Sequence, residues 1–205
     1  MINEDIRHII KAGNANHFSR DPNDWIFVDI GFGGRKNDGA ISKTTGIKIG
    51  ESLSKNVTWA QCVREIITFV ENRNEPLNLM LEAPLSVAFD ITGNPAPRAF
   101  EKTDKGARYW YVPMGTNVAM SALFLLGKLK SNLKAKVNLY ESIVSFKPKK
   151  TDHAADTDSM YDSVVKSFAN PILDFAQKPS DIIESSATMI GWDFGIPPVF
   201  VIDTN

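Results

Sequence analysis

Two strongly apolar segments flank the clearest amphipathic helix of the chain, and this order restricts the fold more than any other feature. The apolar segments are residues 25–32 and 77–83, each of a length typical of a buried strand. Between them, Thr58 and Gln61 have the spacing of a capping box, and apolar residues then recur on one helical face as far as Val70. A strand, a helix and a second strand in this order predict an α/β protein.

The remaining segments extend the pattern. Residues 40–50 predict one or two short antiparallel strands, 116–133 a second helix, 137–141 a strand, 152–169 a third helix, 180–190 a helical segment and 198–202 a last strand. The middle of the second helix is apolar nearly all round, so we expect it to be buried on several sides. The whole pattern predicts a mixed central sheet flanked by helices.

Length and composition are those of one globular domain. The 205 residues, of which 43% are hydrophobic, can bury one core. We expect residues 1–24 to form an N-terminal extension, with a short helix followed by a polar loop, and residues 25–205 to form a single domain. Residues 84–107 are rich in Pro and Gly and predict a long inserted loop, which in a compact domain is more often functional than idle.

Bulk features favour a reducing cytoplasm. No apolar run approaches the roughly 20 residues that span a bilayer, so no membrane partner is expected. The charged N-terminus lacks the apolar region of a signal peptide. The single cysteine, Cys62, lies within a helical pattern and is expected in the core.

Three acidic residues occupy positions typical of a metal site. Asp29 and Glu82 each stand near the end of an apolar strand, and Asp156 lies in the first turn of the third helix. In open α/β sheets ligands bind outside the carboxyl ends of the strands. A buried carboxylate is costly without a partner. A shared cation is therefore expected, either Mg²⁺, which prefers carboxylates and water, or Mn²⁺.

With these residues the chain resembles the ribonuclease-H-like superfamily, in the branch related to the RuvC Holliday-junction resolvases. The resemblance is carried by Asp29-Ile-Gly31, by the strand that ends in Glu82 and by the helical His153-Ala-Ala-Asp156. Glu82-Ala-Pro-Leu85 and His153-Ala-Ala-Asp156 also resemble bacterial proteins known only as predicted nucleases of this fold. RuvC-like enzymes commonly have a further acid at the position of His153.

The resemblance implies a ribonuclease-H-like fold and a metal-dependent nuclease that hydrolyses phosphodiester bonds. Two cations would neutralise charge and activate water. Asp29 would bridge the cations, Glu82 would bind one and Asp156 the other. His153, one helical turn before Asp156, would assist a proton transfer or bind phosphate. The nucleic acid could be RNA, DNA, a hybrid or a branched structure.

Each of these acids also has a simpler interpretation. Asp29 could be a turn residue at the end of its strand, and Glu82 could pair with an arginine such as Arg98. Asp156 could be a first-turn acid that the helix dipole favours. For these residues the sequence leaves both interpretations open.

Three further acids complete the predictions for this region. Asp152 is most simply the N-cap of the third helix. Asp158 falls on the opposite side of the helical stripe from Asp156, so the two are not expected to serve one metal pair. Glu141 also ends a strand and is an alternative additional ligand.

Basic residues suggest how a nucleic acid would be held. Arg98 and Arg108 lie beside aromatic residues in or next to segment 84–107, a combination suited to phosphate contact and base stacking. Lys147 belongs to the lysine-rich segment 128–150, which could form a phosphate-binding rim. Alternatively, an Arg–Glu pair and buried aromatics such as Trp110 could fix the loop, and the lysines could be a solvated surface.

Other functions remain as rivals at this stage. A net charge of −1 gives no global argument for nucleic-acid binding, which favours a non-catalytic binding or assembly module that keeps the fold. The sequence leaves open whether the chain forms a homodimer. Asp29-Ile-Gly31 also looks like the first phosphate motif of actin-like ATPases, but 205 residues hold only one lobe of such an enzyme. Neither a phosphate-binding P-loop nor the elbow of a serine hydrolase occurs.

Overall fold

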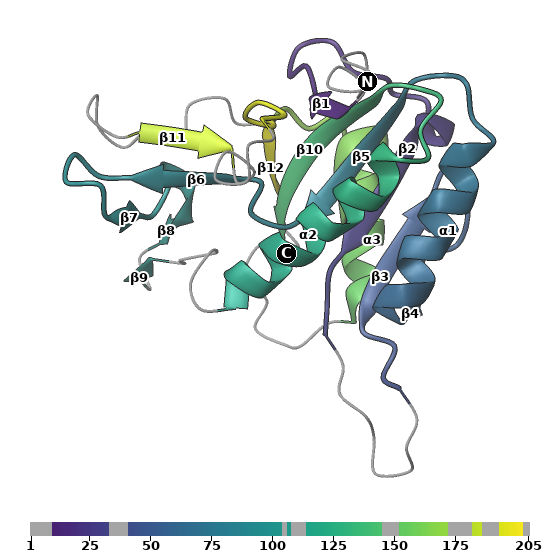
Figure 1. Ribbon diagram of the computed structural model, residues 1–205, viewed down its shortest axis with the longest axis horizontal. Coiled ribbons are helices and arrows are strands. Elements are labelled where there is room, and N and C mark those ends of the chain that lie inside the picture. The colour runs from purple at the N-terminus through teal and green to yellow at the C-terminus, as the bar shows by residue number, and fades with distance from the viewer. Residues whose placement is uncertain are drawn as a thin grey trace.

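The computed structural model describes residues 10–32, 41–103, 106–107, 114–144, 152–171, 182–185 and 193–202. In this part of the chain a seven-stranded sheet forms the centre of the molecule (Figure 1). Its strands are β1 (Ile10–Ala12), β2 (Trp25–Asp29), β3 (Thr45–Ile49), β4 (Lys55–Val57), β5 (Leu77–Glu82), β10 (Val137–Val144) and β12 (Val199–Ile202).

The strands follow the order β1-β10-β5-β2-β3-β4, and β12 also pairs with β10. The pairs between β2, β5, β10, β1 and β12 are parallel, whereas β3 and β4 run antiparallel beside β2. The predicted mixed sheet is therefore confirmed. Because β2 and β5 are parallel neighbours, their carboxyl ends meet at the same edge of the sheet.

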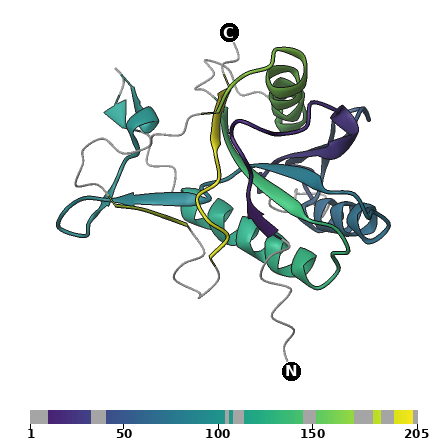
Figure 2. The same cartoon turned by 90° about the horizontal axis from the view of Figure 1, so that it is seen from above.

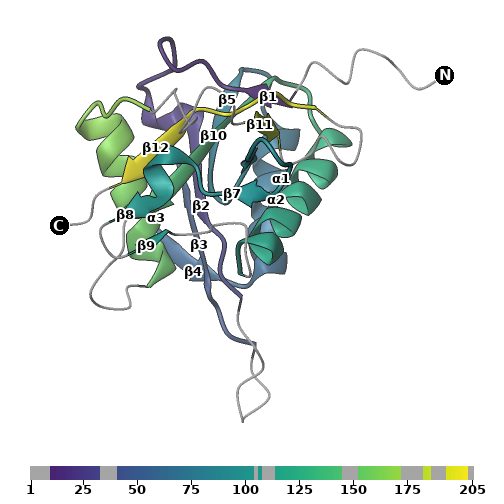
Figure 3. The same cartoon turned by 90° about the vertical axis from the view of Figure 1, so that its left-hand side faces the viewer.

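Helices cover both faces of this sheet. α1 (Trp59–Glu71) and α2 (Met114–Lys130) pack on one face, and α3 (His153–Tyr161) packs on the other (Figure 3). Alternate side chains of a strand point to opposite faces. Accordingly, Val28 and Leu81 belong to the core under α1 and α2, while Phe27 and Met80 belong to the core under α3.

The start of α1 is as the sequence predicts. The Thr58 hydroxyl accepts a hydrogen bond from the backbone N–H of Gln61 at 3.2 Å, and the Gln61 side chain accepts from the Thr58 N–H at 3.0 Å. This reciprocal pair is the predicted capping box. The same helix buries Cys62 completely, so its predicted place in the core is also confirmed.

Segment 84–107 is not the long loop that its Pro and Gly content predicts. β6 (Ser86–Phe89), β7 (Pro95–Ala96) and β11 (Ile182–Ser185) form a second, antiparallel sheet, and β8 (Lys102–Thr103) pairs with β9 (Gly106–Ala107). β6 and β11 extend away from the central sheet (Figure 2). Inside the segment β6 pairs with β7 and β8 pairs with β9, whereas the third strand of the sheet, β11, lies far away in the sequence, where no local signal could reveal it. For residues 182–185 the predicted helix near 180–190 is wrong for the same reason.

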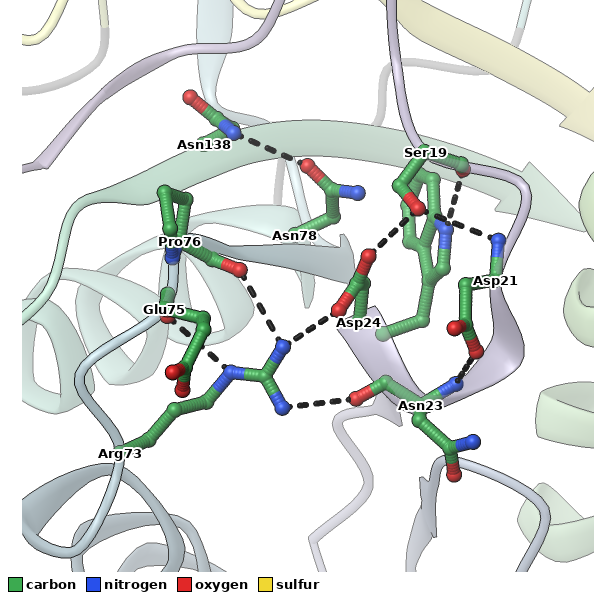
Figure 4. A network of polar contacts seen from close by, with 10 residues as sticks. Ser19, Asp21, Asn23, Asp24, Arg73, Glu75, Pro76, Asn78 and Asn138 are labelled. Carbon is green, nitrogen blue, oxygen red and sulfur yellow. Dashed lines mark hydrogen bonds and ion pairs between the residues drawn. The ribbon is translucent and has the colours of Figure 1, made fainter.

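Part of segment 10–24 belongs to the central sheet. β1 pairs with β10 in the central sheet, a strand that the sequence pattern did not predict; residues 1–9 lie outside the described part. Figure 4 shows how the segment before β2 is held. Arg73 donates to the carbonyl oxygens of Asn23 at 3.0 Å and Pro76 at 3.3 Å, and it also pairs with Asp24.

α2 is less buried than its sequence predicts. Met120 is 57% exposed and Phe124 is 51% exposed, so only one side of the helix packs against the sheet and α1. The prediction that α2 is covered on several sides is therefore wrong within the single chain. Among the described residues, no helix has the length and the apolar character that crossing a bilayer requires.

Candidate metal centre

One lateral row of residues crosses four neighbouring strands at the edge where β2 and β5 end. The register pairs Glu82 of β5 with Asp29 of β2, Asp29 with Gly46 of β3, and Gly46 with Asn56 of β4. Residues in register point to the same face of a sheet. Asp29 lies two residues after Phe27, and Glu82 lies two residues after Met80. Because Phe27 and Met80 face α3, the row also faces α3.

Asp29 is the centre of the row. It is 3% exposed, and its Oδ2 lies 2.6 Å from Nδ1 of His153 on α3. A buried carboxylate needs a partner that replaces its lost hydration. The imidazole provides this partner, and the carboxylate in turn orients the ring, so the two side chains fix each other.

α3 starts directly above the row. Asp152 is its N-cap, as predicted, and accepts a hydrogen bond from the Ala155 N–H at 2.8 Å. Asn56 accepts from the Ala154 N–H at 3.0 Å. Because two of the first N–H groups are bound in this way, the first turn of α3 is tied both to its own cap and to the edge strand β4.

Two glycines provide the space for this close approach. A Cβ atom on Gly31 would lie 2.5 Å from Nε2 of His153, and a Cβ atom on Gly46 would lie 2.1 Å from the His153 backbone oxygen. Both separations are well below a van der Waals contact. Gly31, part of the Asp29-Ile-Gly31 motif, therefore makes room for the imidazole, and Gly46 makes room for the backbone of the helix.

The outcome is a group of three metal-binding side chains. Asp29, His153 and Asp156 each offer a ligand atom, and these atoms all lie within 4.8 Å of one another. Asp156 is 8% exposed and stands one turn after His153 on α3. The structure thus brings together Asp29 and Asp156, as the sequence predicts, and adds the His153 nitrogen to the donor set.

Glu82 lies beside this group rather than within it. It is Asp29's neighbour in the row and faces the same side of the sheet. Its Oε1 accepts a hydrogen bond from the Val144 N–H at 3.3 Å. Adjacent strands are about 4.8 Å apart, so Asp29 stands between Glu82 on one side and the two α3 residues on the other.

Glu141 is not part of the site, which corrects the alternative that made it an additional ligand. It is in register with Leu81 and therefore faces α1 and α2, on the opposite side of the sheet from Asp29. It is completely buried and lies 2.6 Å from Arg98. Burial raises the pKa of Glu141, while the Arg98 charge acts to lower it.

Arg98 has a structural role, so the expectation that it contacts a substrate is corrected. Its guanidinium is fully buried, pairs with Glu101 at 2.9 Å and with Glu141, and donates to the Ser86 hydroxyl at 2.8 Å. Burial disfavours its charge, but the two carboxylates outweigh this effect and raise the Arg98 pKa. The Arg–Glu alternative is what the structure contains, although the partner is not Glu82.

The remaining predicted residues lie elsewhere. Asp158 binds the Ser54 hydroxyl at 2.6 Å and Lys48 at 3.2 Å, on the other side of α3 from the site, as expected. Arg108, Lys147 and Trp110 lie outside the described residues. Lys134 and Lys136 precede β10, at the edge of the sheet opposite to Asp29, so these two lysines do not border the candidate centre.

A cavity of about 650 Å³ also lies at that opposite edge. It is lined by Ala12, Gly13, Asn14, Ala15, His17, Lys136, Asn138, Ile196 and Pro198. None of these residues belongs to the row across the sheet. The cavity is therefore separate from the carboxylate and imidazole group.

Sequence reasoning missed Gly46 and Asn56. A glycine inside a strand signals the close approach of another backbone, and Gly46 is such a residue. β4 itself was not predicted, and because asparagine is depleted in strands, Asn56 gave no signal of its place in the sheet. Neither residue identifies the partner, because α3 follows about a hundred residues later in the chain.

Comparisons of this chain with protein-family models, with curated proteins and with solved structures found no match.

Proposed function

We propose that the chain is a metal-dependent phosphodiesterase of ribonuclease-H-like fold that acts on nucleic acid. The single observation that carries this proposal is the convergence of ligand atoms from Asp29, His153 and Asp156 within 4.8 Å. The mixed sheet with helices on both faces is consistent with that fold. The acids at the strand ends and the His153-x-x-Asp156 spacing are the features that resemble the RuvC-related branch.

The donor set fits divalent cations. Asp29 has candidate metal ligands on both sides: Glu82 lies beside it in the same row, and His153 and Asp156 lie on α3, which covers the row. It is therefore the carboxylate best placed to be shared between two cations. Bound there, the cations would supply an activated water and neutralise charge on the leaving oxygen.

The protein's own residues would prepare this chemistry. Asp29 holds the His153 imidazole through Nδ1, and this contact orients the ring within the site. The nearly complete burial of Asp29 and Asp156 strengthens their attraction for a cation, since little water competes with them. The role proposed for Glu82 is to complete the site from the neighbouring strand.

The imidazole bears on the choice between the two cations expected from the sequence. Mg²⁺ favours oxygen ligands, whereas transition ions such as Mn²⁺ accept imidazole nitrogen as well as carboxylate oxygen. Two carboxylates with one imidazole therefore favour Mn²⁺ over Mg²⁺. Both ions were expected from the sequence, and we propose that Mn²⁺ binds more tightly than Mg²⁺.

Calorimetric titration with Mn²⁺ tests the proposed centre. Wild-type protein should show a saturable site, and Asp29→Asn should remove it. Asp158→Asn is the matched control, because Asp158 is also an α3 carboxylate but binds Ser54 and Lys48 instead. Equal Mn²⁺ binding by wild type and Asp29→Asn would refute the metal centre.

Cleavage assays then test the reaction. Fluorescent single-stranded and double-stranded DNA and RNA, together with a four-way junction, would be incubated with the protein and Mn²⁺. We expect at least one substrate to be cut by the wild type and by Asp158→Asn, but not by Asp29→Asn. Metal binding without cleavage of any substrate would favour the rival, a non-catalytic nucleic-acid-binding or assembly module.

A further inference from the structure

The edge strand β4 contacts the start of α3 through one side chain. Asn56 Oδ1 accepts a hydrogen bond from the Ala154 N–H at 3.0 Å, across 98 positions of sequence. Ala154 directly follows His153 and lies two residues before Asp156. Holding its backbone therefore holds the turn of helix that carries both of these ligands.

The sheet sets the distance between this anchor and Asp29. Asn56, Gly46 and Asp29 are consecutive members of the same row on β4, β3 and β2. Their lateral spacing is determined by backbone hydrogen bonds, at about 4.8 Å per strand. Asn56 thus draws the helix toward a point that is rigidly placed relative to Asp29.

Gly46 of β3 limits how closely the first turn of α3 can approach the sheet. The backbone of His153 packs so closely on Gly46 that a Cβ atom there would lie 2.4 Å from the His153 carbonyl carbon. The helix is therefore held by Asn56 on one side of this contact and by the Asp29–His153 pair on the other. The height and the rotation of the first turn of α3 are both constrained.

We propose that Asn56 is a positioning residue of the metal centre, acting through the Ala154 backbone to aim His153 and Asp156 at Asp29. This role rests on the proposed function. Removing groups that orient metal ligands commonly lowers metal affinity by about 10–100-fold. We expect the loss of the Asn56 acceptor to raise the Mn²⁺ dissociation constant by about tenfold or more.

Three variants separate positioning from general stability. Asn56→Ala removes the acceptor. Asn56→Asp keeps an oxygen at the same place, so it should restore binding. Thr58→Ala is the matched control: it removes a side chain that caps a helix N–H only two residues away, but the helix is α1 and not α3.

The measurements are Mn²⁺ titration and the ¹⁵N signals of the His153 ring in metal-free protein. We expect Asn56→Ala to weaken Mn²⁺ binding and to shift the His153 Nδ1 signal, because the contact with Asp29 is disturbed. Asn56→Asp and Thr58→Ala should retain wild-type affinity and His153 signals. The cleavage assay is not needed for this test.

Two results would overturn the role of Asn56. One is an Asn56→Ala variant with wild-type Mn²⁺ affinity and an unchanged His153 signal. The other is an equal loss of affinity in Asn56→Ala and Thr58→Ala, which would reflect stability alone. If the wild type binds no Mn²⁺, the proposed function is refuted. The His153 signal of Asn56→Ala in metal-free protein then decides by itself whether Asn56 positions His153.

Discussion

Gly46 offers the sharpest test of the packing that builds the site. In the substitution Gly46→Ala the new Cβ atom would lie 2.1 Å from the His153 backbone oxygen and 2.4 Å from its carbonyl carbon. Ordinary contacts begin at 3.4 Å, so a gap of 3.4 − 2.1, about 1.3 Å, must open between β3 and α3. The clashing atoms are backbone atoms, and no change of side-chain rotamer can relieve them.

The expected effect has two parts. Overpacking of this kind destabilises proteins by about 1–3 kcal/mol. For a domain of this size each kcal/mol lowers the melting temperature by roughly 2–4 °C. In addition, the gap displaces the turn of α3 that carries His153 and Asp156, and disturbing the orientation of metal ligands commonly lowers metal affinity by about 10–100-fold, so the Mn²⁺ affinity should fall together with the stability.

Gly127→Ala is the matched control for this substitution. Gly127 lies in α2, and a Cβ atom there would meet nothing within 4 Å. Replacing a helical glycine by alanine without strain stabilises by about 0.4–1 kcal/mol. Differential scanning calorimetry and Mn²⁺ titration of both variants measure the contrast. If Gly46→Ala melts at or above the wild-type temperature and binds Mn²⁺ normally, the close packing of α3 on β3 is refuted.

Two further predictions follow from the buried charges and from the donor set. Arg98→Met should destabilise by about 3–5 kcal/mol, because it leaves Glu101 and Glu141 buried without their cation. Burial raises the pKa of Glu141 and the Arg98 charge acts to lower it, so the substitution raises this pKa further. A carboxyl group whose pKa is raised by folding keeps its proton longer in the native state, so the stability of the variant falls more than that of the wild type as the pH rises above the ordinary Glu141 value of 4.5. In urea unfolding, the free energy of unfolding lost by Arg98→Met relative to wild type should therefore be larger at pH 8 than at pH 5. An equal loss at both pH values would mean that Arg98 and Glu141 do not form an ion pair. His153→Asp should shift the affinity ratio from Mn²⁺ toward Mg²⁺ in competition titrations; an unchanged ratio would mean that the imidazole is not a ligand.

The elements nearest to the site were well predicted where the signal was local. The apolar runs that became β2 and β5, the capping box of α1 and the Asp152 cap of α3 all depend on residues close together in the chain. The proximity of Asp29 and Asp156 could also be anticipated, because strand ends and the first turn of a helix are recognisable positions.

Predictions failed where a distant partner decided the outcome. Segment 84–107 forms strand pairs within itself, and its strand β6 gains a further partner in the distant strand β11. Arg98 was expected either to face a substrate or to pair with a glutamate, and it pairs with its near neighbour Glu101 and with Glu141 on the distant strand β10. The composition of a segment carries no information about a partner that the fold brings from elsewhere.

By itself, the sequence determined the elements with a strong local pattern, among them β2, β5 and α1, and the acids at the strand ends, because periodicity and caps are properties of neighbouring residues. Only the tertiary structure decided the sheet register. Register placed Glu82, Asp29, Gly46 and Asn56 in one row under α3, and the alternation of side chains sent Glu141 to the opposite face. A shift of one residue would reverse these faces, and burial of the alternating apolar side chains against helices from distant parts of the chain selects the alignment.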